Sequence, residues 1–226
     1  MDFKAGEIFA IDKPYRISSF GALAHVRYVL SRTLGYKVKI GHAGTLDPLA
    51  TGVLILCTGK ATKRIEEFQG QTKEYTATLQ LGATTASYDM EHEVNASFPT
   101  EHITRELIND TLPQFIGDIE QIPPTYSAVK VNGDRAYELR RAGEEVKLKP
   151  KHIHIDEIEV VEFDVEKMQL SLRVVCGKGT YIRALARDLG RALNSGAYLT
   201  ALRRTRVGDF TIDRCLDYEH IREWIE

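Results

Sequence analysis

Residues 41–57 read Gly-His-Ala-Gly-Thr-Leu-Asp-Pro-Leu-Ala-Thr-Gly-Val-Leu-Ile-Leu-Cys, and the rest of the chain is interpreted around this stretch. Its first twelve residues hold three glycines and a proline, which predicts a shaped loop. The apolar run that follows, 53–57, predicts a buried strand. The loop carries one carboxylate, Asp47, and one imidazole, His42, and loops held by a strand often carry catalytic groups. A simple turn explains the same spacing, because Asp before Pro commonly starts one.

The composition describes a globular chain without a strong charge of either sign. Its 226 residues are 43% apolar, enough for a sizeable core, and the formal net charge is -2. A protein that coats nucleic acid nonspecifically carries a large positive charge, so that class is excluded, although a local basic groove is not. We expect one domain covering residues 1–226, because the sequence contains no repeat, low-complexity tract or linker.

The sequence gives no sign of export, membrane insertion or metal binding. Residues 1–9 lack the apolar region of a signal peptide, and no run approaches the roughly 20 apolar residues of a membrane span. Three widely spaced cysteines, Cys57, Cys176 and Cys215, favour free thiols in a reducing compartment. His152 and His154 could in principle ligate a metal, but alternation along a strand explains the pair better. We therefore expect a cytoplasmic protein without a metal site.

The hydrophobic pattern alternates between strand and helix periods along the chain. Strands are expected at 7–11, 53–57, 73–81, 126–131, 146–148, 153–163, 168–176 and 198–207, with a tight turn at Asn132-Gly133. Helices are expected after Ser18 or Ser19, at 61–68, 101–112 and 135–141, after Thr180, and at 218–225. Segment 82–98 is expected to be a polar connection with solvated acids at Asp89, Glu91 and Glu93. Because no strict βαβ rhythm is present, we predict an α+β fold with a mixed, mainly antiparallel central sheet flanked by helices and loops.

Few motifs point to chemistry on their own. The sequence contains no P-loop, dinucleotide-binding glycine motif, metal-ligand set or nucleophile elbow. Gly177-Lys178-Gly179-Thr180 resembles a phosphate-binding turn leading into a helix, although an ordinary helix cap has the same form. Tyr181, Arg183 and Arg187 follow it, and residues 203–206, Arg-Arg-Thr-Arg, add positive charge. Taken singly, each cation is explained as a solvated surface residue.

Together these motifs resemble those of the TruB-type tRNA pseudouridine synthases. Residues 41–54 resemble the signature loop of that family, Asp12-Lys13-Pro14 its first motif, and Lys73-Glu74-Tyr75 its tyrosine segment. Further matching blocks are Ile122-Pro123-Pro124 with Tyr126-Ser127-Ala128, Gly179-Thr180-Tyr181-Ile182-Arg183, and Leu202-Arg203-Arg204. The blocks occur in the family's order and span nearly the whole chain. The resemblance implies a pseudouridine synthase-like fold and an isomerase that uses no cofactor.

The resemblance also implies a substrate and a set of catalytic residues. The family isomerises uridine to pseudouridine in the T-loop of tRNA, at uridine 55. Asp47 matches its essential aspartate, taken as the nucleophile, and a carboxylate can add to either the sugar or the base. Arg183 matches the arginine that pairs with this aspartate and favours its ionised form. Tyr181 matches a tyrosine that contacts the base near the aspartate and suits proton handling at C5.

Three further residues match positions that bind the substrate. Tyr75 matches the tyrosine that stacks on the target base, and Leu202 matches an apolar wall of the uracil pocket. His42 matches a histidine placed where the flipped nucleotide leaves its loop. Each also has a structural explanation, as a core tyrosine, a core leucine and a loop filler. The implied partner is the T-arm stem-loop of tRNA, with no membrane and no obligate protein partner.

The chain departs from the family pattern in two places. After Lys13-Pro14 the family usually has a glycine two residues on, whereas this chain reads Tyr15-Arg16-Ile17. Many bacterial members continue into a small C-terminal RNA-binding domain, and this sequence stops at Glu226, so we expect weaker or more salt-sensitive tRNA binding. Two alternatives stay open. The same chemistry could act on another stem-loop RNA, or the fold could serve as a non-catalytic RNA-binding or tRNA-folding module.

Overall fold

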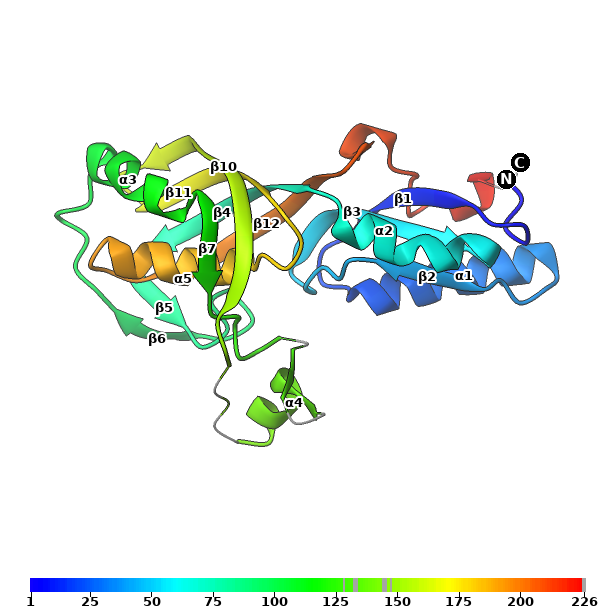
Figure 1. Ribbon diagram of the computed structural model, residues 1–226, viewed down its shortest axis with the longest axis horizontal. Helices are drawn as coiled ribbons and strands as arrows, with labels where there is room; N and C mark the ends of the chain where they lie inside the picture. Colours follow the sequence, from blue (N-terminus) through cyan, green and yellow to red (C-terminus); the bar gives the residue numbers. More distant parts are fainter. Residues whose placement is uncertain (128, 132–133, 144–145, 147, 225–226) are drawn as a thin grey trace. The chain divides into compact units, whose positions relative to one another are not determined.

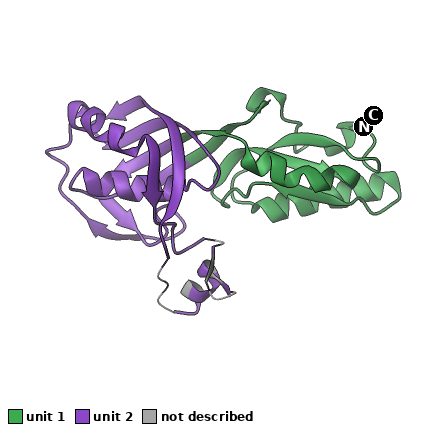
Figure 2. Cartoon of the chain, in the orientation of Figure 1, with its two compact units in different colours: residues 1–76, 202–226 green, residues 77–201 purple. Residues whose placement is uncertain are grey.

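The computed structural model describes residues 1–127, 129–131, 134–143, 146 and 148–224. The chain divides into two compact units, described here one at a time (Figure 2): unit 1 is Met1–Thr76 with Leu202–Glu226, and unit 2 is Ala77–Ala201. Strands β4 (Lys73–Leu81) and β12 (Ala197–Val207) each begin in one unit and end in the other. The chain therefore enters unit 2 along β4 and leaves it along β12.

Unit 1 is built around β3 (Ala50–Thr58), the strand that follows the glycine-rich loop (Figure 1). β1 (Ile8–Lys13) and β2 (Ile40–Ala43) both pair antiparallel with β3, whereas β12 pairs parallel with it. A short strand, β13 (Phe210–Thr211), pairs antiparallel with β12. The predicted mixed pairing is therefore present in this unit.

Side chains alternate along β1 and β3, so the strands of unit 1 bury both faces. On one face Phe9, Ile11, Leu54 and Leu56 pack with the apolar stripe of α1 (Ser19–Leu34). On the other face Ala10, Val53, Ile55 and Cys57 pack with Phe68 of α2 (Ile65–Gly70), which continues from the 3-10 turn η1 (Gly59–Arg64). Helix α1 begins as predicted after Ser18, whose side chain accepts the Gly21 N–H, and ends at Gly35 in the left-handed conformation.

Unit 2 continues the sheet in the order β12, β4, β11 (Gln169–Cys176), β10 (Lys151–Asp164) and β7 (Gly117–Gln121). β10 pairs antiparallel with both of its neighbours, as predicted. Helix α5 (Ile182–Ala192) has its buried stripe at Ile182, Leu185 and Leu189. The remaining elements are β5 (Ala83–Thr85), β6 (Val94–Ser97), α3 (Arg105–Thr111), η2 (Leu112–Phe115), β8 (Lys130–Val131), β9 (Asp134–Arg135) and α4 (Ala136–Arg141).

Several predicted bounds are wrong. Helix α3 starts four residues later than predicted, because Thr104 rather than Thr100 caps it, accepting the Leu107 N–H. The polar connection at 82–98 contains the antiparallel pair β5–β6. Of the described residues within 126–131, only 130–131 form a strand, and residues 146 and 148 lie in none; Ala128, Asn132-Gly133 and Lys147 lie outside the described residues.

The end of the chain also differs from its prediction. The expected helix at 218–225 is a 3-10 turn, η4 (Ile221–Trp224), preceded by η3 (Ile212–Arg214). Leu216 donates its N–H to the carbonyl of Ala10, which joins this segment to β1. Within the described ranges, no helix is both long and apolar enough to cross a bilayer.

Candidate active site

The glycine-rich loop runs from β2 into β3 in unit 1, and close backbone approach explains its glycines. Gly52 has φ 105°, and a Cβ there would lie 2.1 Å from the carbonyl oxygen of Arg204 on the paired strand. Gly44 also has a left-handed φ, 88°. The glycines predicted to shape the loop are therefore required by geometry at these two positions.

Asp47 lies in a turn that Ser19 holds from helix α1. The Ser19 hydroxyl accepts the Leu46 N–H at 2.7 Å and donates to the Leu46 carbonyl at 3.0 Å. The carbonyl of Asp47 itself accepts the Ala50 N–H at 3.0 Å, which closes the turn. The simple turn interpretation is thus correct for the backbone, and the half-buried Asp47 side chain is presented by a loop with fixed hydrogen bonds.

Lys13, at the end of β1, also binds the loop that contains Asp47. Its fully buried ammonium donates to the carbonyls of Pro14 at 2.8 Å, Ile17 at 2.6 Å and Pro48 at 3.4 Å. Burial lowers the pKa of Lys13 to about 8, and the nearby Asp47 carboxylate partly opposes that shift. Sequence reasoning saw Lys13 only as part of a turn and a family motif, because nothing in its sequence neighbourhood signals burial.

The backbone conformation of Arg16 shows what the glycine of the family's first motif supplies. Its φ is 63°, in the left-handed region that favours glycine, and its N–H donates to the Pro48 carbonyl at 2.9 Å. The turn therefore has glycine-like geometry with an arginine at the position where the family usually has glycine.

Arg204 is a structural residue rather than the solvated cation that its sequence context suggested. It is 1% exposed, and its guanidinium donates to the carbonyls of Val53 at 2.8 Å and Gly44 at 3.0 Å. It also acts on His42 in β2: burial, with Arg204 adding to it, lowers the pKa of His42. His42 is therefore neutral at pH 7, and its buried Nδ1 has no hydrogen-bond partner among the described residues.

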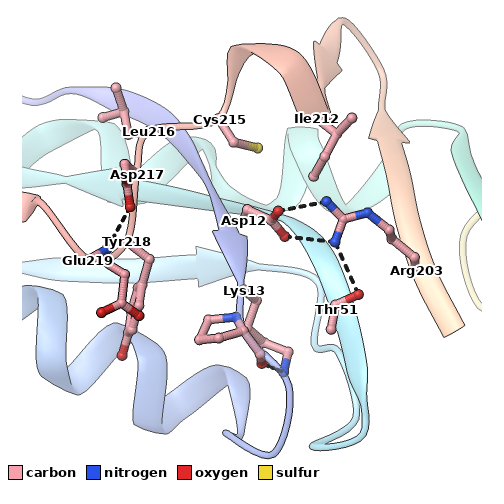
Figure 3. Close-up of a pocket in the computed structure, with 11 residues that line it drawn as sticks. Asp12, Lys13, Thr51, Arg203, Ile212, Cys215, Leu216, Asp217, Tyr218 and Glu219 are labelled. Atoms are coloured by element: carbon pink, nitrogen blue, oxygen red, sulfur yellow. Dashed lines mark hydrogen bonds and ion pairs between the residues drawn. The ribbon is translucent and has the colours of Figure 1, made fainter. Parts of the chain in front are cut away.

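Arg203 and Arg206, unlike Arg204, are paired with carboxylates. Arg203 binds Asp12 through two nitrogens, at 2.6 and 3.2 Å, and donates to the Thr51 hydroxyl at 3.2 Å (Figure 3). This pair lies in a pocket of about 400 Å³ that also contains Asp217 and Glu219. Arg206 lies 3.6 Å from Glu74. Two of the three arginines at 203–206 thus face carboxylates within unit 1, and Arg204 binds carbonyls.

The two other substrate-binding candidates of unit 1 differ in exposure. Tyr75 on β4 is 8% exposed, which agrees with its predicted core position. Leu202 on β12 is half-buried and pairs with Ala50, at the start of β3. Unit 1 therefore contains Asp47, His42, Tyr75 and Leu202, whereas Tyr181 and Arg183 belong to unit 2.

Arg183 is held in unit 2 by three groups that converge on its guanidinium. Nη1 donates to the Ser87 carbonyl at 3.1 Å and Nη2 to the Tyr126 carbonyl at 2.9 Å. Nε lies 3.7 Å from the Asp89 carboxylate. Arg183 is 4% exposed and Asp89 is 6% exposed, so the prediction that Asp89 is solvated is wrong. A buried charge requires a partner, which explains why the Asp89 side chain lies beside the Arg183 guanidinium and not in solvent.

The segment around Asp89 is shaped by a strained residue. Tyr88 has φ 62°, rare for a residue with a side chain, and the Arg187 guanidinium lies over its ring at 5.2 Å. The conformation of Tyr88 directs the Ser87 carbonyl and the Asp89 carboxylate to the same guanidinium. The Ser87 hydroxyl and the Glu91 N–H both donate to Asp89 Oδ1, at 2.5 and 2.9 Å.

Tyr181 occupies the N-cap position of α5, where Thr180 was predicted. Its side chain is half-buried, and its backbone is hydrogen-bonded to Gln121 at the end of β7. Sequence reasoning missed Gln121, since its partner lies 60 positions away.

The described part of the chain was expected to contain no metal site. Among the described residues, no group of three or more His, Cys, Asp or Glu side chains could hold one. His152 and His154 lie on β10, as strand alternation predicted, and His154 Nδ1 is 2.7 Å from Asp118. The three cysteines are free thiols. The chemically distinctive groups are thus the carboxylate of Asp47 near a buried ammonium, and the buried guanidinium of Arg183 beside the Asp89 carboxylate.

Comparison with known proteins gives a consistent set of relatives. The family model described as TruB family pseudouridylate synthase (N terminal domain) matches residues 31–182, and that of the tRNA pseudouridylate synthase B C-terminal domain matches 183–226. A tRNA pseudouridine synthase B of Bacteroides thetaiotaomicron is 62% identical over 100% of this chain and 95% of the relative. One of Flavobacterium johnsoniae is 49% identical over 100% and 98%, respectively.

A solved structure shares the fold. In the crystal structure of a Cbf5-Nop10-Gar1 complex, one chain superposes with a TM-score of 0.72 at 28% identity. The match covers 99% of this chain and 56% of that chain, so the present chain spans little more than half of its length. The predicted α+β fold class, with its mainly antiparallel sheet, is confirmed.

Proposed function

Because the chain belongs to the TruB family of tRNA pseudouridine synthases, we propose that it converts uridine 55 in the T-loop of tRNA to pseudouridine. As a member of this family, the chain is an isomerase that makes pseudouridine in tRNA. We propose further that residues 1–226 act as one catalytic domain, in the cytoplasm, without a cofactor or an obligate protein partner. The observation that carries the proposal is the Asp47 loop, which Ser19, Lys13 and Arg204 hold through five hydrogen bonds to its backbone and flanking residues.

In the proposed mechanism Asp47 is the nucleophile. The bond between N1 of uracil and C1′ of the ribose breaks, the base rotates, and C5 bonds to C1′. The C5 proton is lost and N1 gains a proton, so the reaction is balanced without an oxidant or a second substrate. A carboxylate supports this sequence by adding to the sugar or to the base and leaving again. The hydrogen bonds around Leu46 and Pro48 favour this role, because they fix the backbone on either side of Asp47.

The other candidates have supporting roles in the proposal. Arg183 is the proposed partner of Asp47, and hydrogen bonds to two carbonyls give its buried guanidinium a fixed orientation. Tyr181 moves the proton at C5, and Tyr75 stacks on the base. His42 and Leu202 contact the flipped nucleotide, with His42 as a neutral imidazole because its pKa is lowered.

The experiment is pseudouridine mapping on an unmodified tRNA transcript incubated with the purified chain alone. We expect pseudouridine at position 55 with the wild type and none with Asp47→Asn, while tRNA binding is kept. Asp110→Asn, a change of the same chemistry on α3 in unit 2, serves as the matched control and should be active. Full activity of Asp47→Asn would exclude this residue as the nucleophile.

Two alternative functions are tested in the same assay. If another stem-loop RNA is converted and tRNA is not, the chemistry stands but the substrate assignment is wrong. If wild type and Asp47→Asn improve tRNA folding equally and neither makes pseudouridine, the chain is a folding module rather than an enzyme.

A further inference from the structure

We propose that Gln121 is a positioning residue for Tyr181, fixing through its side-chain amide the backbone from which the Tyr181 phenol reaches the target base. The inference rests on the proposed function, because it assigns Tyr181 a role in catalysis. It extends that function to a residue that touches no substrate and acts through another.

The contact is a two-point clamp between one amide and one peptide backbone. Gln121 Oε1 accepts the Tyr181 N–H at 2.9 Å, and Gln121 Nε2 donates to the Tyr181 carbonyl at 3.2 Å. Gln121 is 2% exposed, so neither bond competes with bulk water. A primary amide is the only common neutral side chain that offers both a donor and an acceptor in this planar arrangement. The two bonds together fix both the position and the orientation of the Tyr181 backbone.

Within α5 the Leu185 N–H donates to the Tyr181 carbonyl at 3.0 Å, and the Tyr181 N–H is held by Gln121. Tyr181 precedes helix α5 in an extended conformation and makes no side-chain cap. Gly179, two residues earlier, has φ 90°, and the buried Thr180 hydroxyl has no hydrogen-bond partner among the described residues. Gln121 does not cap the first N–H groups of the helix; it holds the N–H and the carbonyl of the residue from which the helix starts.

Residues that follow Gln121 also bind α5, through their backbone carbonyls. The Ile122 carbonyl accepts from Arg187 at 2.9 Å, and the Tyr126 carbonyl accepts from Arg183 at 2.9 Å. The segment 121–126 thus contacts Tyr181 and two arginines of the helix in turn. Because Gln121 is the point where β7 ends, the clamp ties Tyr181 to the sheet of unit 2.

The test compares Gln121→Met, which removes both hydrogen bonds at similar volume, with Gln80→Met as the matched control. Gln80 also bonds backbone carbonyls of unit 2, those of Leu81 and Lys167, but does not contact Tyr181. We expect Gln121→Met to lower the single-turnover rate of pseudouridine formation by about 10- to 100-fold, with tRNA affinity unchanged. Gln80→Met should stay near the wild-type rate.

A double-mutant cycle with Tyr181→Phe separates positioning from a general structural role. If Gln121 acts through the Tyr181 phenol, its loss costs much less in the Tyr181→Phe background than in the wild type. Should Gln121→Met fail to fold by circular dichroism, Gln121→Glu replaces it, because a carboxylate keeps the acceptor and loses the donor. An unchanged rate in the folded variant, or fully additive effects, would overturn the inference while the wild type remains active. A wild type that makes no pseudouridine would overturn the proposed function and the inference together.

Discussion

The Nε atom of Arg183 lies 3.7 Å from the carboxylate of Asp89, and both side chains are buried. Asp89 thus places a carboxylate beside the charge that Arg183 carries into the interior of unit 2. Removing one partner of a buried ion pair leaves the other uncompensated, at a cost of roughly 3–5 kcal/mol when the pair is fully desolvated. The orientation of Arg183 therefore depends on Asp89, which was predicted to be solvated because the residues around it in the sequence are polar.

We expect Asp89→Asn to slow pseudouridine formation by at least about 10-fold and to lower stability by about 1–3 kcal/mol, since the amide keeps the shape but not the charge. Rates in single-turnover assays and urea unfolding measure the two effects. The control is Glu93→Gln, an exposed acid of the same segment, which should change neither. Equal behaviour of the two variants would show that Asp89 does not orient Arg183.

Neighbouring serines at the start of α1 allow a second comparison. Ser18 caps the helix, whereas Ser19 binds the N–H and the carbonyl of Leu46, next to Asp47. Ser18→Ala should cost about 1 kcal/mol of stability, as caps do, and leave activity unchanged. Ser19→Ala should cost about 1–3 kcal/mol and also lower the rate, because two buried groups of the loop lose their partner. If both variants reduce the rate alike, the Ser19 contact has no special role in the loop.

Gly52 and Gly35 allow two reasons why a position requires glycine, a left-handed φ and a close backbone approach, to be tested separately. Both have a left-handed φ, but a Cβ at Gly52 would lie 2.1 Å from a backbone oxygen, whereas nothing lies within 4 Å of one at Gly35. Gly35→Ala should cost only the strain of φ, about 1 kcal/mol. Gly52→Ala must also separate β3 from β12, so we expect failure to accumulate as folded protein. Soluble yield and thermal unfolding test this, and a stable Gly52→Ala would contradict the close approach.

Arg16 permits the reverse experiment. Because Arg16 already has the φ of a glycine, Arg16→Gly should be tolerated, with stability within about 1 kcal/mol of the wild type. Arg16→Val should be destabilising by about 1–3 kcal/mol, since a β-branched side chain strongly disfavours this conformation. Thermal unfolding of the two variants should therefore differ in this order, and the opposite order would exclude backbone strain as the cause.

The strands and long helices could be predicted because their patterns are local. The alternation at 73–81 gives β4 with the same bounds, and Ser18 with Gly35 frames α1. Asp47 was likewise found on its loop from local signals and family motifs. The predicted start of α3 failed for a local reason, because Thr104 and not Thr100 accepts an N–H of the first turn. The Asp89 prediction failed because a distant partner decides: Asp89 is buried by Arg183, 94 positions later in the sequence.

The residues that hold the site were missed for the same reason. Lys13, Arg204 and Gln121 all bind main-chain groups of loops remote in sequence, and the identity of such a residue says nothing of where its partner lies. A buried lysine or arginine is rare enough that sequence reasoning defaults to a solvated one. Only the fold shows that these cations bind carbonyls rather than phosphate.

Lys13 gives the last prediction, because its pKa makes the Asp47 loop sensitive to alkaline pH. In the folded chain the pKa is about 8, against 10.5 for an ordinary lysine. Below about pH 8 both states hold the proton, so stability does not vary through this group. Between the two values the unfolded state binds more protons, so the free energy of unfolding contributed by Lys13 rises with pH, by up to about 3 kcal/mol.

Urea unfolding of wild type and Lys13→Met at about pH 7 and about pH 10 measures this contribution. Between these two pH values, the free energy of unfolding of the wild type should rise relative to that of the variant. Activity should move the other way, because a neutral amine has two N–H donors for three carbonyls and loosens the loop. Parallel stability curves for the two proteins would show that Lys13 does not titrate in this range.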